Sequence, residues 1–121
     1  MNRRMAYHSF FDNGIRAAAG SDFSPGPFAA LMGIQGMVTR TGWNGETWGA
    51  NQRISVDEAL QVNTMNGAYN SHEEVIKGSI TPGKLADFVV LADDPHTVSK
   101  EKIKDIEIVR TVTGGSTVYQ K

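Results

Sequence analysis

The sequence contains no cysteine. That absence excludes a disulfide framework, a cysteine-ligated zinc site, an iron–sulfur cluster and a thiol nucleophile. An excess of charge of one sign is lacking too, because 12 Lys and Arg residues face 13 Asp and Glu residues, a formal net charge of −1. Such a balance gives the chain no general electrostatic attraction to nucleic acid or to anionic lipid, so we expect neither as a partner.

Long apolar stretches are also missing. Runs such as residues 88–92 are far shorter than the ~20 residues that cross a membrane. The N-terminus contains two arginines but no apolar core of a secretory signal. We therefore expect a soluble, cytoplasmic protein, and 121 residues are enough for one domain at most.

Glycine, in contrast, is abundant. The 13 glycines among 121 residues are about 11% of the chain, above the usual share of about 7%. Many lie in turn-like contexts, which predicts short elements joined by many connections. Apolar spacing predicts a helix over residues 3–12 and a second one over residues 28–39, with Pro27 in its first turn. Between them, residues 15–20 form a short apolar run whose length and flanking glycines favour a buried strand. Residues 41–53 are expected to form an irregular loop.

Ser and Glu residues at capping distance mark further helix starts. Ser55 and Glu58 form a capping box that predicts a helix to about Asn63. Thr64 is expected to cap a short helix over residues 64–70. The pair Ser71 and Glu74 suggests another capping box with about one helical turn.

The tail has the character of a β-structure. The Pro-Gly pair at residues 82–83 suits a type II turn, and residues 86–91 form a β-rich run. Residues 106–113 and 116–119 are predicted to pair across Gly114-Gly115, since both central positions of a type I′ turn need positive φ. A change of character near residue 77 separates a βα-like part, residues 1–77, from a β-rich part, residues 78–121.

Asp22 is the leading candidate for chemistry. It directly follows the predicted strand over residues 15–20, and the C-terminal ends of strands hold ligands and metals in α/β architectures. A carboxylate there could ligate a metal or act as a general base. Alternatively, Asp22 caps the following helix or stabilises the Ser-Pro turn.

The other candidates are weaker. Ser24 lacks the sequence context of a nucleophile, and Trp43 and Trp48 could line a pocket or pack only within their own loop. The three histidines have no spacing typical of a local metal motif, so we interpret them as surface or helix-end residues.

Several stretches, in this order, resemble the C-terminal end of amidohydrolase superfamily enzymes. The closest branch is amidohydrolase family 3, which includes metal-dependent hydrolases similar to N-substituted formamide deformylase. Residues 13–22 resemble its last barrel strand, which ends in Gly-Ser-Asp, and residues 53–60 resemble the helix after the barrel. The most specific match is the run Gly-Ser-Ile-Thr-Pro-Gly-Lys-Leu-Ala-Asp at residues 78–87.

The resemblance implies an α/β fold. Residues 1–77 would be the last βα unit of a (β/α)₈ TIM barrel, and residues 78–121 would be the C-terminal strands of the accompanying β-sandwich. It also implies zinc or another divalent metal in the complete enzyme, with Asp22 as both a metal ligand and the catalytic proton acceptor. The substrate would be a small amide, and Ser24, Trp43 and Trp48 would line its site.

Most of the family's metal ligands have no counterpart here. The chain has no His-x-His and no other barrel strand, so we expect it to be inactive alone. The alternative is a non-catalytic module that self-associates or completes a barrel in trans. Since a piece of a barrel leaves apolar faces uncovered, we expect a homo-oligomer.

Overall fold

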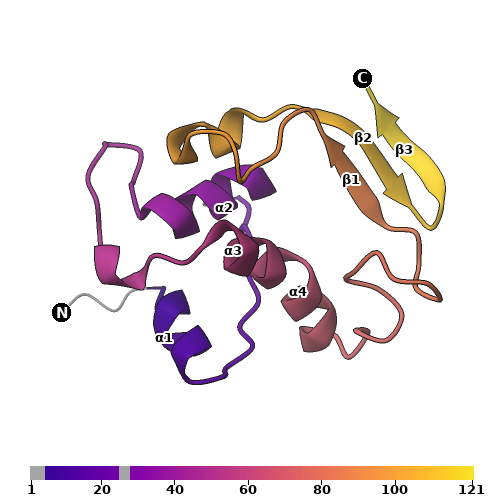
Figure 1. Cartoon of the computed structure of the whole chain (residues 1–121), viewed down its shortest axis with the longest axis horizontal. Coiled ribbons are helices and arrows are strands. Elements are labelled where there is room, and N and C mark those ends of the chain that lie inside the picture. The colour runs from indigo at the N-terminus through magenta and orange to yellow at the C-terminus, as the bar shows by residue number, and fades with distance from the viewer. Residues whose placement is uncertain (1–4, 25–27) are drawn as a thin grey trace.

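The computed structural model describes residues 5–24 and 28–121 and combines a helical part with a small sheet (Figure 1). The expected helical residues 3–4 and Pro27 lie outside the described residues. The elements, in chain order, are α1 (Tyr7–Asp12), α2 (Ala30–Thr39), η1 (Ala50–Gln52), α3 (Val56–Asn63), α4 (Met65–Asn70), β1 (Phe88–Leu91), η2 (Lys100–Asp105), β2 (Ile108–Thr113) and β3 (Ser116–Gln120).

The capping box predicted for α3 is confirmed. The Ser55 hydroxyl accepts from the Glu58 N–H at 3.2 Å, and the Glu58 carboxylate accepts from the Ser55 N–H at 2.7 Å. Because these bonds fix the start of α3, Ala59 and Val62 point into the core, where both are fully buried. Thr64 precedes α4 without a side-chain cap, since its hydroxyl donates to the Leu60 carbonyl at 2.8 Å.

Two expected elements do not form. Residues 15–20 are extended but are not a strand, because the described part of the chain offers them no neighbouring strand to pair with. The capping box predicted at Ser71 is also wrong. His72 adopts a left-handed φ of 59° there, which a helix cannot contain, and the segment forms turns.

The tail folds as predicted into an antiparallel sheet with the strand order β1-β2-β3. Phe88 pairs with Val112, and Thr113 pairs with Ser116 next to the hairpin. Gly114 and Gly115 turn the chain there with φ of 57° and 80°, values that favour glycine at both positions. Gly83, with φ of 92°, makes the turn expected at residues 81–84, closed by a 3.1 Å bond from Lys84 N–H to the Thr81 carbonyl.

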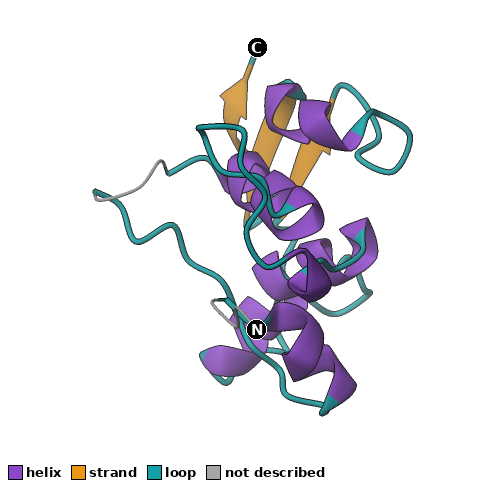
Figure 2. Ribbon diagram, turned by 90° about the vertical axis from the view of Figure 1, so that its left-hand side faces the viewer, coloured by secondary structure: helices purple, strands orange, loops and turns teal. Residues whose placement is uncertain are grey.

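One apolar core joins the helices to the tail. Ile103 and Ile106 of the tail are buried with Ile34, Val38 and Val62, so η2 packs on α2. Figure 2 shows the strands at one end of the molecule and most of the helices extending away from them.

Gly78 lies where the tail leaves α4. A Cβ atom at this position would come within 2.7 Å of the Ala68 Cβ, and φ is 94°. Both the space and the backbone conformation therefore call for glycine.

Within residues 5–24 and 28–121, no helix has the length and apolar character to cross a membrane.

Candidate functional site

Asp22 stands at the end of the extended segment formed by residues 15–20. The segment starts at a turn in which the Ile15 N–H donates to the Phe10 carbonyl at 2.8 Å. Ala17 and Ala19 then pack against the core, with the two-residue period of a strand that faces the helices. The segment thus runs along the helical layer, formed by α1, α2, α3 and α4, and ends just before Asp22.

The backbone of Asp22 adopts a left-handed conformation, with φ of 49°. Aspartate tolerates this region better than most residues, and such conformations concentrate at functional sites. The side chain is exposed, and in the described part of the chain no hydrogen bond or ion pair of the Asp22 carboxylate is present. Ser24 is likewise exposed two residues further on.

Trp43 and Trp48 lie on a separate loop. A bridge between Thr41 and Thr47 closes this loop, and the Arg40 guanidinium donates to the Trp48 carbonyl at 3.1 Å. Both tryptophans are exposed, Trp43 to 81% and Trp48 to 55%. The possibility that they form the loop's own packing core is therefore wrong.

The structure does not bring these candidates together. Among the described residues, no hydrogen bond, ion pair or ring contact joins any two of Asp22, Ser24, Trp43 and Trp48. Residues 5–24 and 28–121 also contain no group of three His, Asp or Glu side chains able to hold a metal ion. One carboxylate is too few, since catalytic zinc sites use about three protein ligands.

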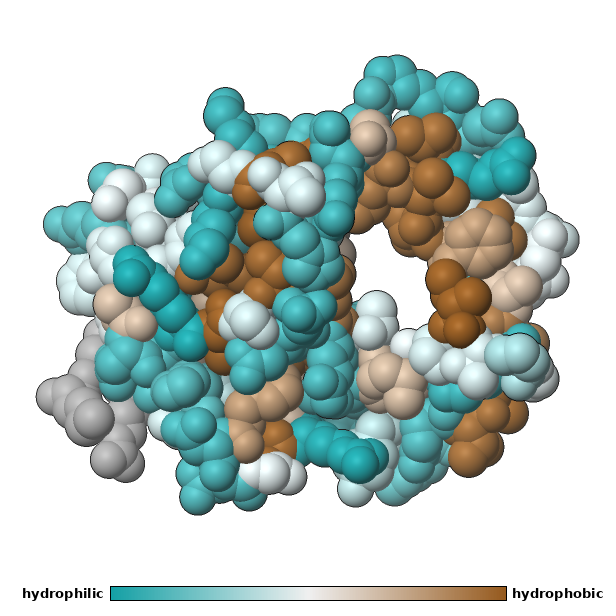
Figure 3. All heavy atoms as spheres, viewed as in Figure 1, coloured by the Kyte–Doolittle hydropathy of each residue, from teal (hydrophilic) through white to brown (hydrophobic). Residues whose placement is uncertain are grey.

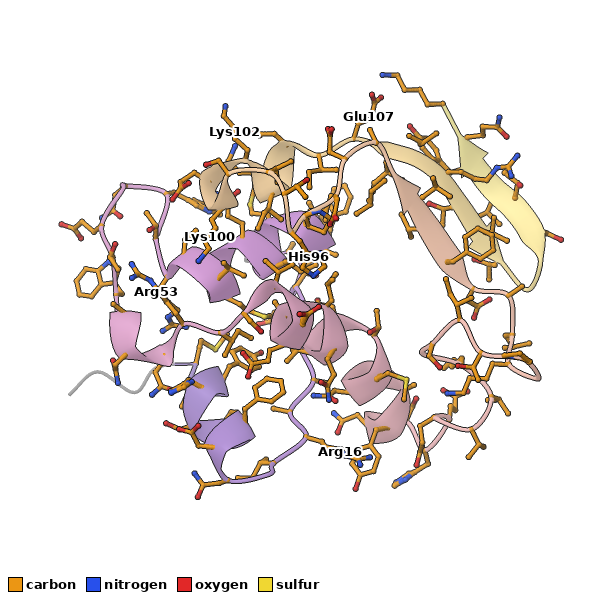
Figure 4. All side chains as sticks on the ribbon, in the orientation of Figure 1. Arg16, Arg53, His96, Lys100, Lys102 and Glu107 are labelled. Carbon is orange, nitrogen blue, oxygen red and sulfur yellow. The ribbon has the colours of Figure 1, made fainter. Side chains whose placement is uncertain are left out.

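One polar cluster lies elsewhere and was missed by sequence reasoning. The His96 ring contacts two carboxylates, through Nδ1 to Asp94 at 2.7 Å and through Nε2 to Asp57 at 2.9 Å. Figure 4 labels His96. Bonds to Asp94 and then Asp57 raise the pKa of His96, and bonds from the His96 backbone and ring lower the pKa of Asp94. Asp57 is 39 residues away in sequence, so no local spacing could have revealed the contact.

Comparison with known proteins identifies the chain at the family level. The profile of the amidohydrolase family matches residues 6–119, which is almost the whole sequence. The chain belongs to the amidohydrolase family. The match confirms the resemblance seen in the order of the sequence motifs.

Two curated relatives extend the comparison. Amidohydrolase YtcJ of Bacillus subtilis is 33% identical over 124 residues, which cover 100% of this chain and 23% of that protein. N-substituted formamide deformylase of Arthrobacter pascens is 28% identical, over 93% of this chain and 21% of that enzyme. This amidohydrolase chain therefore spans less than a quarter of the length of these relatives.

Solved structures agree with the fold. An amidohydrolase from Thermotoga maritima superposes with a TM-score of 0.71 and 21% identity, over 95% of this chain and 26% of that one. The guanine deaminase of E. coli gives a TM-score of 0.70 at 23% identity, over 94% of this chain and 30% of that enzyme. At these identities the likeness concerns the fold, an amidohydrolase-type arrangement of helices with a three-stranded sheet.

Proposed function

We propose that this chain acts as the C-terminal part of a metal-dependent amidohydrolase that cleaves non-peptide C–N bonds of the amide or formamide type. In that assembly residues 1–77 supply the last βα unit of a TIM barrel, and residues 78–121 supply strands of the adjoining β-sandwich. The observation that carries the proposal is the exposed carboxylate of Asp22 at the end of an extended segment that pairs with no strand among the described residues. A neighbouring barrel strand would pair with that segment.

The residues of this chain do not make a complete metal site, because the described part has no group of three ligating side chains. Zinc or another divalent metal would need its remaining ligands from outside these 121 residues. We therefore expect the isolated chain to be inactive.

In the assembled site Asp22 would act as a general base. Its exposed carboxylate can accept the proton of the attacking water and pass it to the leaving amine, which requires only hydrogen-bond reach to both. Ser24 and the solvent-facing Trp43 and Trp48 are the residues of this chain that we propose as the lining for a small amide.

A second candidate function is a non-catalytic module that self-associates or completes a barrel partner in trans. Exposed apolar side chains favour it: 86% of Ile80, 77% of Phe28 and 76% of Val75 are open to solvent. Figure 3 shows apolar surface at the right-hand wall of the opening between the helices and the sheet. A homo-oligomer in the cytoplasm, without nucleic-acid or membrane partners, is part of this proposal.

Complementation tests the enzymatic proposal. The chain is co-expressed with the part of the Bacillus subtilis relative that precedes the matched segment, and zinc retention and hydrolysis of an N-formyl amide are measured. We expect neither for the pure chain, both for the complex, and loss of hydrolysis with Asp22→Asn. Asp93→Asn, at an exposed aspartate of the tail, is the matched control.

Equal turnover by the Asp22→Asn and wild-type complexes would refute the role of Asp22. Stoichiometric zinc together with turnover by the pure chain would refute its incompleteness. If the chain forms a stable complex without hydrolysis, the non-catalytic module becomes the better account.

A further inference from the structure

Asn66 of α4 is a buried polar residue, with only 2% of its surface exposed. Its side-chain amide donates to the Ala17 carbonyl at 2.9 Å, across 49 residues of sequence. The Gln61 side chain approaches the Asn66 Oδ1 at 3.4 Å, which orients the amide with its N–H groups toward the extended segment. A buried side chain of α4 thus donates a hydrogen bond to a backbone carbonyl of residues 15–20.

A second contact from the same helix meets the neighbouring residue. The Arg16 guanidinium lies over the Tyr69 ring, 4.7 Å from its centroid, in a cation–π contact. Figure 4 shows Arg16 beside α4. Two successive residues of the extended segment, Arg16 and Ala17, are therefore held by two residues of α4.

The bond from the Ile15 N–H to the Phe10 carbonyl fixes only the first residue of this segment, and the apolar contacts further along it do not define a register. Ala17 and Ala19 are partly buried against the core, but small apolar side chains pack without direction. A shift of one residue would turn the opposite face of the segment toward the helices. The directional bond from Asn66 distinguishes the observed register from such a shift, because it reaches one carbonyl only.

We propose that Asn66 is a positioning residue for Asp22. By holding the Ala17 carbonyl, it fixes the register of residues 15–22 on the helical layer and so the place where the Asp22 carboxylate emerges. Tyr69 supports the same register through Arg16. This inference rests on the proposed function, in which Asp22 is the group of this chain that takes part in the reaction.

The test is made on the full chain with NMR. Asn66→Asp removes the donor at nearly constant volume. Asn63→Asp is the matched control, because the Asn63 amide donates to the Ala59 carbonyl at 2.8 Å and approaches the Met37 sulfur at 3.9 Å, and neither partner belongs to residues 15–22. The Ala17 carbonyl shift and the residual dipolar couplings of residues 15–22 report the segment, and the couplings of α2 and α3 report the rest of the fold.

We expect Asn66→Asp to change the Ala17 carbonyl shift and the couplings of residues 15–22 while α2 and α3 keep theirs. Asn63→Asp should leave the segment unchanged even where it lowers the unfolding midpoint. If Asn66→Asp does not fold, Tyr69→Leu replaces it, with the same segment-limited change expected.

Unchanged couplings in residues 15–22, or changes of equal size throughout the molecule, would overturn the inference. Failure of the proposed function is a separate result. It would appear as equal hydrolysis by the complexes carrying Asp22 and Asn at that position, whereas the couplings of the segment do not depend on the carboxylate.

Discussion

His96 makes the stability of this protein depend on pH. Only the protonated imidazole can donate from both ring nitrogens, so both carboxylate contacts, to Asp57 and Asp94, are complete only in that form. These bonds hold the pKa of His96 above its usual 6.5, and the backbone N–H and ring of His96 hold the pKa of Asp94 below its usual 3.8.

The directions of the two pKa shifts define the pH range in which both groups stabilise the folded state. A raised pKa means that the folded state binds the proton more tightly than the unfolded state. The contribution of His96 to the free energy of unfolding is therefore complete below about pH 6 and is lost as the pH rises through the folded-state pKa. The lowered pKa of Asp94 gives a contribution that is present above about pH 4 and is lost as the pH falls. Between these limits both contributions are present.

We expect His96→Gln to lower the thermal unfolding midpoint most between about pH 4.5 and pH 6, and progressively less toward about pH 8.5. Differential scanning calorimetry across this range measures the difference. In an Asp94→Asn background the pH dependence of the His96→Gln effect should become smaller, because only the contact with Asp57 then raises the pKa of His96. A difference between wild type and His96→Gln that grows with rising pH would contradict the assignment.

At the scale of elements, the capping box should govern the stability of α3. Ser55→Ala removes the acceptor for the Glu58 N–H and should lower the free energy of unfolding by about 1 kcal/mol, measured by urea denaturation. Ser116→Ala at the exposed start of β3 is the control, with an expected change within about 0.5 kcal/mol. Equal losses in the two variants would mean that the box contributes little.

The elements predicted correctly from the sequence are those whose signals are local. Gly114 and Gly115 specify a hairpin whatever surrounds them, and Ser55 with Glu58 specifies a helix start within four residues. Residues 15–20 differ, because strand formation needs a partner that the described chain does not contain. Ser71 has the same local pattern as Ser55. There, however, the chain forms turns that bring Gly78 back against Ala68 of α4, and no helix starts.

The candidate site shows the same limit. Asp22 could be singled out because it follows an apolar run directly, and the structure gives it an exposed, left-handed position there. The roles of Asn66 and His96 depend on contacts 49 and 39 residues away in sequence. A single sequence carries no local signal for such contacts.

At the scale of the whole molecule, η2 connects the tail to the helices. Ile103 is fully buried in the core shared with α2 and α3, so Ile103→Ala should cost about 2–5 kcal/mol of unfolding free energy. Val118→Ala, at a side chain that is 63% exposed, should change it by no more than about 0.5 kcal/mol. Urea denaturation followed by circular dichroism measures both.

The same variant tests whether the helices and the sheet unfold together. Hydrogen exchange should show the amides of α3 and of β1 losing protection together in Ile103→Ala, because Val62 of α3 and Leu91 of β1 pack with the same core. If β1 alone lost protection, the sheet would behave as an independent unit.

Self-association is the last property expected of the whole molecule. All residues of β3 are exposed, and this strand is an edge of the sheet, with one side unpaired within the described residues. An exposed edge next to apolar side chains is a template for pairing with another copy. We expect light scattering at about micromolar concentration to show oligomers. Val118→Lys should shift them toward monomer, because charge on an edge strand opposes pairing.

Asn51→Lys adds the same charge at an exposed position of η1 and should leave the distribution unchanged. The comparison separates an effect at the strand edge from a general gain in solubility, since both variants carry one more positive charge. A wild-type chain that is a monodisperse monomer would show that the exposed apolar side chains, Ile80 and Phe28 among them, are tolerated in water. In that case the exposed apolar side chains would serve as a contact surface for a different chain, as completion of a barrel in trans requires.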